Sequence, residues 1–180
     1  GATAPEWGEA GGGLILQVIQ NHLITGSSQS QTAATKLNIT GLNASITPAS
    51  TGSKILIKIR WQGETTVTEE EGVFGIKRNS TDIGSGAAGG GSQPRGIAGQ
   101  ALAYYTADFG STMASAYYEY IDSPSSTSAI TYHATYENKT SGTLYNQRTK
   151  DDNNTTNCER LTSSITLMEL TAATLLEDGS

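Results

Sequence analysis

The chain has 180 residues, of which 36% are hydrophobic, 7% aromatic and 16% charged, and its net charge at neutral pH is −6. That length suits one domain with a single core, and a Ser and Thr content of about a quarter favours strands over a helical bundle. With only 11 Lys and Arg residues, the chain lacks the basic surface of a nucleic-acid binder, and no apolar run approaches the roughly 20 residues of a membrane span. We therefore expect neither a nucleic-acid partner nor membrane insertion.

The chain divides into three parts by composition. Residues 1–13 contain Pro5 and end in Gly11, Gly12 and Gly13, which predicts a flexible linker. Residues 14–170 are expected to form the folded domain, because short apolar or alternating runs recur there between turn residues. Residues 171–180 form a C-terminal tail, whose segment 171–177 has a composition compatible with a short helix.

The recurring runs predict about eight to ten strands. In chain order they are residues 14–20, 37–40, 42–47, 54–61, 73–77, 98–106, 116–121, 130–136, 143–145 and 164–170. Such short strands at regular spacing are typical of an antiparallel β-sandwich or a barrel. We predict an all-β, jelly-roll-like sandwich.

Alternation within three of these runs predicts which side chains are buried. In residues 54–61 the odd positions are Ile or Trp, whereas Lys58 and Arg60 occupy the other face. In residues 116–121 and 130–136 the even positions are mostly Tyr, so these two strands each present an aromatic face. The turn containing Pro124 separates them, and they either form a hairpin with a long loop or belong to opposite sheets.

Residues 84–99 contain seven glycines and predict an exposed loop. Gly84, Gly86 and Gly89 match the spacing of a dinucleotide fingerprint, but no helical pattern follows them and no β-α-β alternation occurs in the chain. The sequence therefore predicts no nucleotide cofactor. The single cysteine, Cys158, cannot form a disulfide within the chain.

The chain offers few residues for catalysis or for binding a metal. His22 and His133 are the only histidines, and the alternation places His133 opposite the Tyr face, where a solvent or interface position is ordinary. Histidines that meet around a threefold axis could bind a metal, and clustered Asp and Asn residues could bind calcium, but the chain has neither a dedicated ligand motif nor a recognisable carboxylate pair. We predict a non-enzymatic protein with no catalytic residue, no metal site and no cofactor.

Tyrosine is the enriched aromatic residue, and its ring and hydroxyl suit both sugar stacking and subunit interfaces. Tyr118, Tyr120, Tyr132 and Tyr136 share a parity and are predicted to be core or interface residues. The remaining candidates for a recognition surface lie near the Gly-rich loop or in two acidic loops, where a rigid scaffold commonly displays binding residues. They are Tyr104, Tyr105, Tyr117, Glu69, Glu70, Arg95, Asp151 and Asn153.

Several segments follow one another in a familiar order. They include residues 16–19 (LQVI), 42–57 (LNASITPASTGSKILI), 74–84 (FGIKRNSTDIG), 120–132 (YIDSPSSTSAITY) and 164–170 (SITLMEL). This order resembles a β-sandwich module common in fibre and other structural proteins of marine and cyanobacterial tailed phages. The resemblance covers nearly all of residues 14–170, and residues 171–180 extend beyond it.

The resemblance implies a virion component located in a tail fibre or on the capsid surface, and analogy with phage fibres implies a homotrimer. The leading expectation is a host-attachment domain that binds a cell-surface glycan or an envelope protein through loops 66–71, 85–99 and 150–157. The first alternative is a capsid decoration or head-fibre protein that contacts other virion proteins. A second alternative is a glycan-cleaving enzyme whose carboxylate pair forms across subunits.

Overall fold

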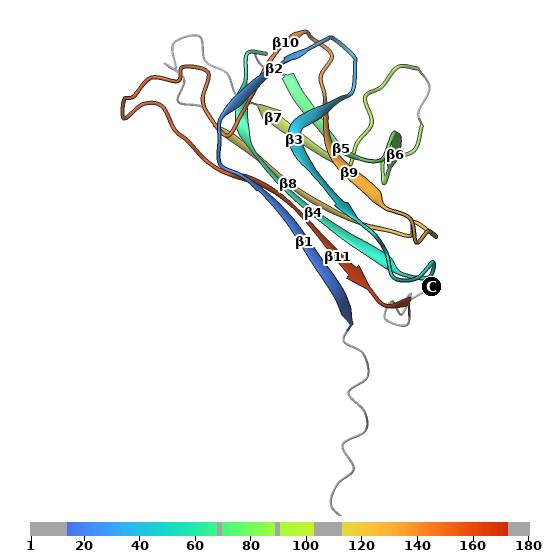
Figure 1. The fold of residues 1–180 in the computed structure, drawn as a ribbon. Helices are drawn as coiled ribbons and strands as arrows, with labels where there is room; N and C mark the ends of the chain where they lie inside the picture. Colours follow the sequence, from blue (N-terminus) through green and yellow to red (C-terminus); the bar gives the residue numbers. More distant parts are fainter. Residues whose placement is uncertain (1–13, 68–69, 89–90, 103–112, 173–180) are drawn as a thin grey trace, which may run out of the picture.

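The computed structural model describes residues 14–67, 70–88, 91–102 and 113–172 of the chain. These residues form eleven strands arranged in two antiparallel sheets, which confirms the predicted all-β sandwich (Figure 1). None of the described residues belongs to a helix with the length and apolar character needed to cross a membrane. The predicted linker, residues 1–13, and most of the predicted tail lie outside the described residues.

Sheet A contains six strands centred on β4. Its strands are β1 (Ile15–Leu23), β2 (Ser27–Gln31), β4 (Lys54–Thr65), β8 (Ala114–Asp122), β10 (Gly142–Asn146) and β11 (Ser163–Leu170). β8 follows one edge of β4 as far as Gly63, while the other edge pairs first with β11 and then, from Gly63 onward, with β10. β1 pairs with the far edge of β11, and β2 with the far edge of β10.

Sheet B contains the other five strands. They are β3 (Leu37–Ile46), β5 (Glu70–Arg78), β6 (Thr81–Ile83), β7 (Ala98–Leu102) and β9 (Ile130–Glu137). β9 lies between β3 and β5, and both β6 and β7 pair with β5. Because β8 lies in sheet A and β9 in sheet B, the turn at Pro124 joins opposite sheets rather than closing a hairpin.

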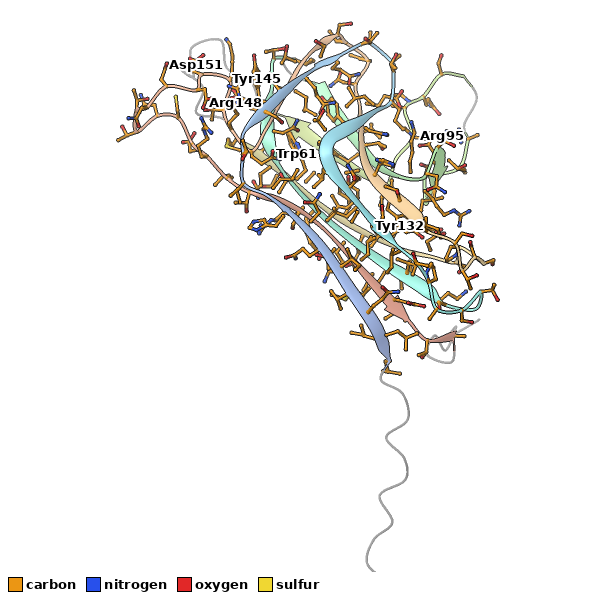
Figure 2. The ribbon with its side chains drawn as sticks, viewed as in Figure 1. Trp61, Arg95, Tyr132, Tyr145, Arg148 and Asp151 are labelled. Carbon is orange, nitrogen blue, oxygen red and sulfur yellow. The ribbon has the colours of Figure 1, made fainter. Side chains whose placement is uncertain are left out.

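The core forms where the inner faces of the two sheets meet. Ile55, Ile57, Ile59 and Trp61 of β4 are fully buried, as the alternation predicted. Across the core, the Phe74 ring of sheet B lies 5.0 Å from the Trp61 ring and 5.2 Å from that of Tyr136, measured between centroids. Figure 2 shows Trp61 and Tyr132 inside the molecule. This aromatic packing fixes the two sheets relative to each other.

Three local expectations differ from the structure. The runs 37–40 and 42–47 form one strand, β3, because Gly41 adopts a positive φ of 75° and the register shifts there without ending the pairing. β2 and β6 were not predicted, since their short polar sequences show no apolar alternation. The loop predicted over 84–99 overlaps the strand predicted from residue 98, and the strand is the one observed: the Ile97 N–H donates to Phe74 O and β7 begins at Ala98.

Candidate functional site

The loop between β10 and β11 is held against the end of sheet A by Arg148. The Arg148 guanidinium lies over the Tyr145 ring, 4.7 Å from its centroid, and its Nη1 donates to Thr149 O at 3.2 Å and Lys150 O at 3.0 Å. Its aliphatic stem packs on Gly26, where an added Cβ would lie 2.9 Å from Arg148 Cδ. Figure 2 shows Tyr145, Arg148 and Asp151 together at this end of the molecule.

Further contacts fix both sides of the same loop. The Glu64 carboxylate of β4 accepts the Lys150 N–H, and the Leu161 N–H donates to Gln147 O at 3.1 Å. The Asp152 carboxylate pairs with Arg148 at 3.9 Å and also with Arg160. The loop is therefore a preorganised structure built on β4 and β10.

The apex of this loop presents polar groups to solvent. Asn153, Asn154, Thr155, Thr156 and Asn157 are all exposed. Amides and hydroxyls both donate and accept hydrogen bonds, and these are the groups that pair with sugar hydroxyls or with a polypeptide backbone. Two predicted recognition residues, Asp151 and Asn153, lie in this loop.

A second polar surface lies beside β6 and the Gly-rich loop. The Lys36 ammonium pairs with Asp82 at 3.1 Å and donates to Arg95 O at 2.8 Å. These three residues, with Gly84 and Ser85, line a cavity of about 230 Å³. Arg95, another predicted recognition residue, is exposed here (Figure 2).

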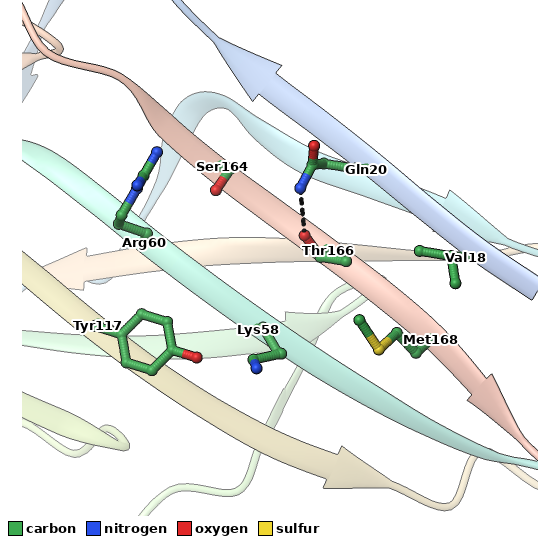
Figure 3. A pocket seen from close by; sticks show the side chains of 8 residues that line it. All are labelled: Val18, Gln20, Lys58, Arg60, Tyr117, Ser164, Thr166 and Met168. Carbon is green, nitrogen blue, oxygen red and sulfur yellow. Dashed lines mark hydrogen bonds between the residues drawn. The ribbon is translucent and has the colours of Figure 1, made fainter. Parts of the chain in front are cut away.

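A third surface is the outer face of sheet A, which carries a shallow trough of about 480 Å³ (Figure 3). The side chains that line it come from β1, β4, β8 and β11. They are Val18, Gln20, Lys58, Arg60, Tyr117, Ser164, Thr166 and Met168. Tyr117 is 58% exposed, so its ring is free for contact with a partner.

A network of ionisable side chains outside these three surfaces lies between the sheets. Asp122 is buried between the sheets, where it pairs with Arg78 at 3.1 Å and accepts the Tyr132 hydroxyl at 2.7 Å. Burial, together with this hydrogen bond to Asp122, raises the pKa of Tyr132. This network joins strands β5, β8 and β9 across the core, so it fixes the sheets to each other.

The two histidines lie on different sheets, His22 on β1 and His133 on β9. Partial burial and the nearby Lys77 ammonium lower the pKa of His133, so its imidazole is neutral at pH 7. Among the residues that the structure describes, no group of three His, Cys, Asp or Glu side chains is placed to hold a metal ion.

The predicted recognition residues are distributed over several surfaces. Tyr104, Tyr105 and Glu69 lie outside the described residues, and Glu70 begins β5. Tyr117 lines the trough on sheet A, and Arg95 lines the cavity beside Lys36. Asp151 and Asn153 lie in the β10–β11 loop. Among the candidates that the structure describes, only Asp151 and Asn153 therefore share a surface.

The sequence did not single out Arg148, Tyr145 or Lys36, although each organises one of these surfaces. The charged and amide side chains of residues 147–154 indicate a polar loop, but no spacing rule indicates that Arg148 folds back over Tyr145. Comparisons with known proteins do not assign a role to these residues, because no protein-family model and no curated protein matches the chain.

Proposed function

We propose that this chain is a non-enzymatic binding domain of a phage virion, and that its β10–β11 loop attaches to a glycan on the host cell surface. The observation that carries the proposal is the combination of a fixed base and an exposed polar apex in this loop. A loop that is ordered before binding loses little conformational entropy when it meets its ligand. The resemblance of residues 14–170 to phage structural modules supplies the biological context.

The position of the loop on the sandwich supports this proposal. The Thr171 N–H donates to Leu14 O at 3.1 Å, so the first and last described segments lie side by side. β4 runs from this end, where Lys54 pairs with Leu170, to the opposite end, where Glu64 accepts the Lys150 N–H. Figure 1 shows the β10–β11 loop at the end of the sheets away from the start of β1. A domain held near Leu14 would thus present the loop outward.

Binding of the purified chain to an array of bacterial cell-surface oligosaccharides tests this function. We expect the triple variant Asn153→Ala, Asn154→Ala and Asn157→Ala to lose at least about tenfold in affinity, because each lost hydrogen bond contributes about 0.5–1.5 kcal/mol. Thr127→Ala, at an exposed position in the β8–β9 turn, is the matched control and should bind like the wild type. Equal binding by the triple variant, or no binding by the wild type, would overturn the proposal.

Labelling of intact virions with an antibody against this chain tests the location. Label at the distal ends of tail fibres supports host attachment. Label spread over the head would instead favour the capsid decoration alternative, in which the polar loop contacts neighbouring shell proteins.

A further inference from the structure

The outer face of sheet A is organised in rows that cross four strands. Because β1, β11, β4 and β8 are paired in continuous register, a residue on one strand has a defined neighbour on each of the others. Side chains at alternate positions point outward, so every second level of the register contributes one row to this face. Three successive rows have different chemistry.

The first row is aliphatic on all four strands. Val18 of β1 pairs with Met168 of β11, Met168 with Leu56 of β4, and Leu56 with Ile121 of β8. Val18 is 53% exposed and Ile121 is 39% exposed, at the two ends of the row. A contiguous aliphatic strip across a sheet, with no covering element in the chain described here, is typical of a surface that a partner covers.

The second row is polar. It contains Gln20, Thr166, Lys58 and Glu119, which are paired in the same strand order. The Gln20 amide donates to Thr166 Oγ1 at 2.9 Å (Figure 3), and Lys58 lies 4.0 Å from Glu119. One cation and one anion balance each other within the row.

The third row combines an aromatic ring with hydrogen-bonding and cationic groups. It contains His22, Ser164, Arg60 and Tyr117. Figure 3 shows Arg60 and Tyr117 on adjacent strands at this level, next to Ser164. The chemistry of the face therefore changes from one row to the next along the strands. Within the first row it does not change, because all four strands contribute an apolar side chain.

We infer that this face binds the same face of a second copy of the chain, around a rotation axis parallel to the strands. Such an axis keeps every row at its own level, so the aliphatic row of one copy meets the aliphatic row of the next. It also reverses the strand order between copies, so that β1 of one copy lies opposite β8 of the other. Val18 then meets Ile121 of the second copy, and the Gln20 amide faces the Glu119 carboxylate.

The chemistry of the face favours a second copy over a glycan. Sugar rings stack on aromatic side chains, and the two aromatic rings of these rows, Tyr117 on β8 and His22 on β1, lie at opposite edges of the face, whereas four apolar side chains lie together in a single row. The charges are also complementary within the face itself, so two copies can meet without placing like charges opposite each other. The resemblance implied a trimer without naming a face, and this inference goes beyond the glycan-binding function because it concerns a separate surface.

A cysteine pair can test both the face and the orientation. In a Cys158→Ser background, the double variant Val18→Cys and Ile121→Cys places its two cysteines three strands apart, roughly 14 Å within one chain. The backbones of two sheets packed face to face lie about 10 Å apart, which is too far for a direct disulfide, so a bis-maleimide about 10 Å long is the suitable crosslinker. The separation within one chain exceeds the reach of this reagent, so only chains in contact can be crosslinked. We expect the reagent to produce crosslinked chains on a denaturing gel.

The matched control moves one cysteine to another row. Val18→Cys with Tyr117→Cys places the second thiol four residues further along β8, roughly 13 Å from the level of Val18. We expect at least tenfold less crosslinking from this pair. Equal crosslinking of both pairs, or of neither, would overturn the inferred arrangement.

Light scattering measures the assembly itself. The same face on both chains implies a twofold axis, so we expect the mass of the wild-type chain to be that of a dimer, and Leu56→Glu to reduce it to that of a monomer. Ile24→Glu, at an aliphatic residue that is 68% exposed outside the three rows, should keep the wild-type mass. A monomeric wild type, or an unchanged mass for Leu56→Glu, would overturn the inference. The apex triple variant should retain the assembled mass, which separates this inference from a failure of the glycan-binding proposal.

Discussion

Glu169 shows how a single residue can place a carboxylate inside the sandwich. It lies on the inner face of β11 with no exposed surface, yet it accepts hydrogen bonds from Gln17 Nε2 at 2.6 Å and from the Ala49 N–H at 2.7 Å. Burial raises the pKa of this carboxyl, but the nearby Ser53 hydroxyl and the hydrogen bonds from Gln17 and the Ala49 N–H lower it by more, so the pKa lies below its ordinary value of 4.5. The charged form is therefore stabilised by folding.

This residue predicts a pH dependence of stability. A carboxyl whose pKa is lower in the folded state contributes stability above its unfolded pKa, and that contribution is lost as the pH falls through the folded value. We expect Glu169→Gln to lower the free energy of unfolding at pH 7 by about 2 kcal/mol, because the new amide presents N–H groups to existing donors. The difference from the wild type should shrink as the pH falls below 4.5.

Urea denaturation at pH 7, 5 and 3.5 measures this dependence. Asp151→Asn, in the β10–β11 loop, is the control and should change stability little at any of these pH values. A deficit of Glu169→Gln that stays constant down to pH 3.5 would contradict the assignment of the stabilisation to the charged carboxylate.

At the scale of elements, Gly63 marks the point where β4 changes partner from β11 to β10. A Cβ at Gly63 would lie 2.4 Å from the Trp61 ring and would also overlap Tyr145 O. The close approach of β10 therefore requires the absence of a side chain at this position. Because β10 leads directly into the candidate recognition loop, the glycine also positions that loop.

We expect Gly63→Ala to destabilise the fold by about 3 kcal/mol, since overlap with a backbone oxygen can be relieved only by moving β10. The matched control is Gly86→Ala, because a Cβ at Gly86 meets no atom within 4 Å. Thermal unfolding followed by circular dichroism measures both variants. Similar melting temperatures for the two would show that β10 can shift without cost.

Arg148 controls the order of the β10–β11 loop more than the stability of the whole fold. Its contacts with Tyr145, Thr149 and Lys150 are local to the loop and its base. We expect Arg148→Ala to increase tryptic cleavage after Lys150 about tenfold or more under native conditions, because the loop opens without global unfolding. Arg95→Ala, in a different loop, is the control and should leave this cleavage rate unchanged. An unchanged rate for Arg148→Ala would contradict the proposed anchoring.

At the scale of the whole molecule, the strands that could be predicted from the sequence are those in which apolar and polar residues alternate. Both β4 and the side of it that faces the core were predicted, because Ile55, Ile57 and Ile59 repeat with a period of two. β2 has the sequence SSQSQ and becomes a strand only because β10 pairs with it, which local composition does not indicate. The sequence therefore predicted the class of fold but not every strand.

The candidate surfaces were harder to predict for the same reason. Tyr117 and Asp151 were selected as exposed polar or aromatic residues, and the structure places them on different surfaces. The aliphatic row needs the register of four strands from distant parts of the chain, and a shift of one residue would turn its side chains into the core. That Val18 and Ile121 belong to the same aliphatic row can therefore be seen only from the assembled sheet.

The inferred assembly predicts that thermal stability depends on protein concentration. If folded chains associate through the aliphatic row, mass action stabilises the folded dimer by about 1.4 kcal/mol for each tenfold increase in concentration, which is about 0.7 kcal/mol per chain. For a domain of this size that corresponds to a rise of about 2 °C in the melting temperature per tenfold increase. Leu56→Glu should remove this dependence, whereas Ile24→Glu should keep it, because Ile24 lies outside the rows. Differential scanning calorimetry over a hundredfold concentration range measures the slope, and a flat wild-type response would show that folding and association are not coupled through this face.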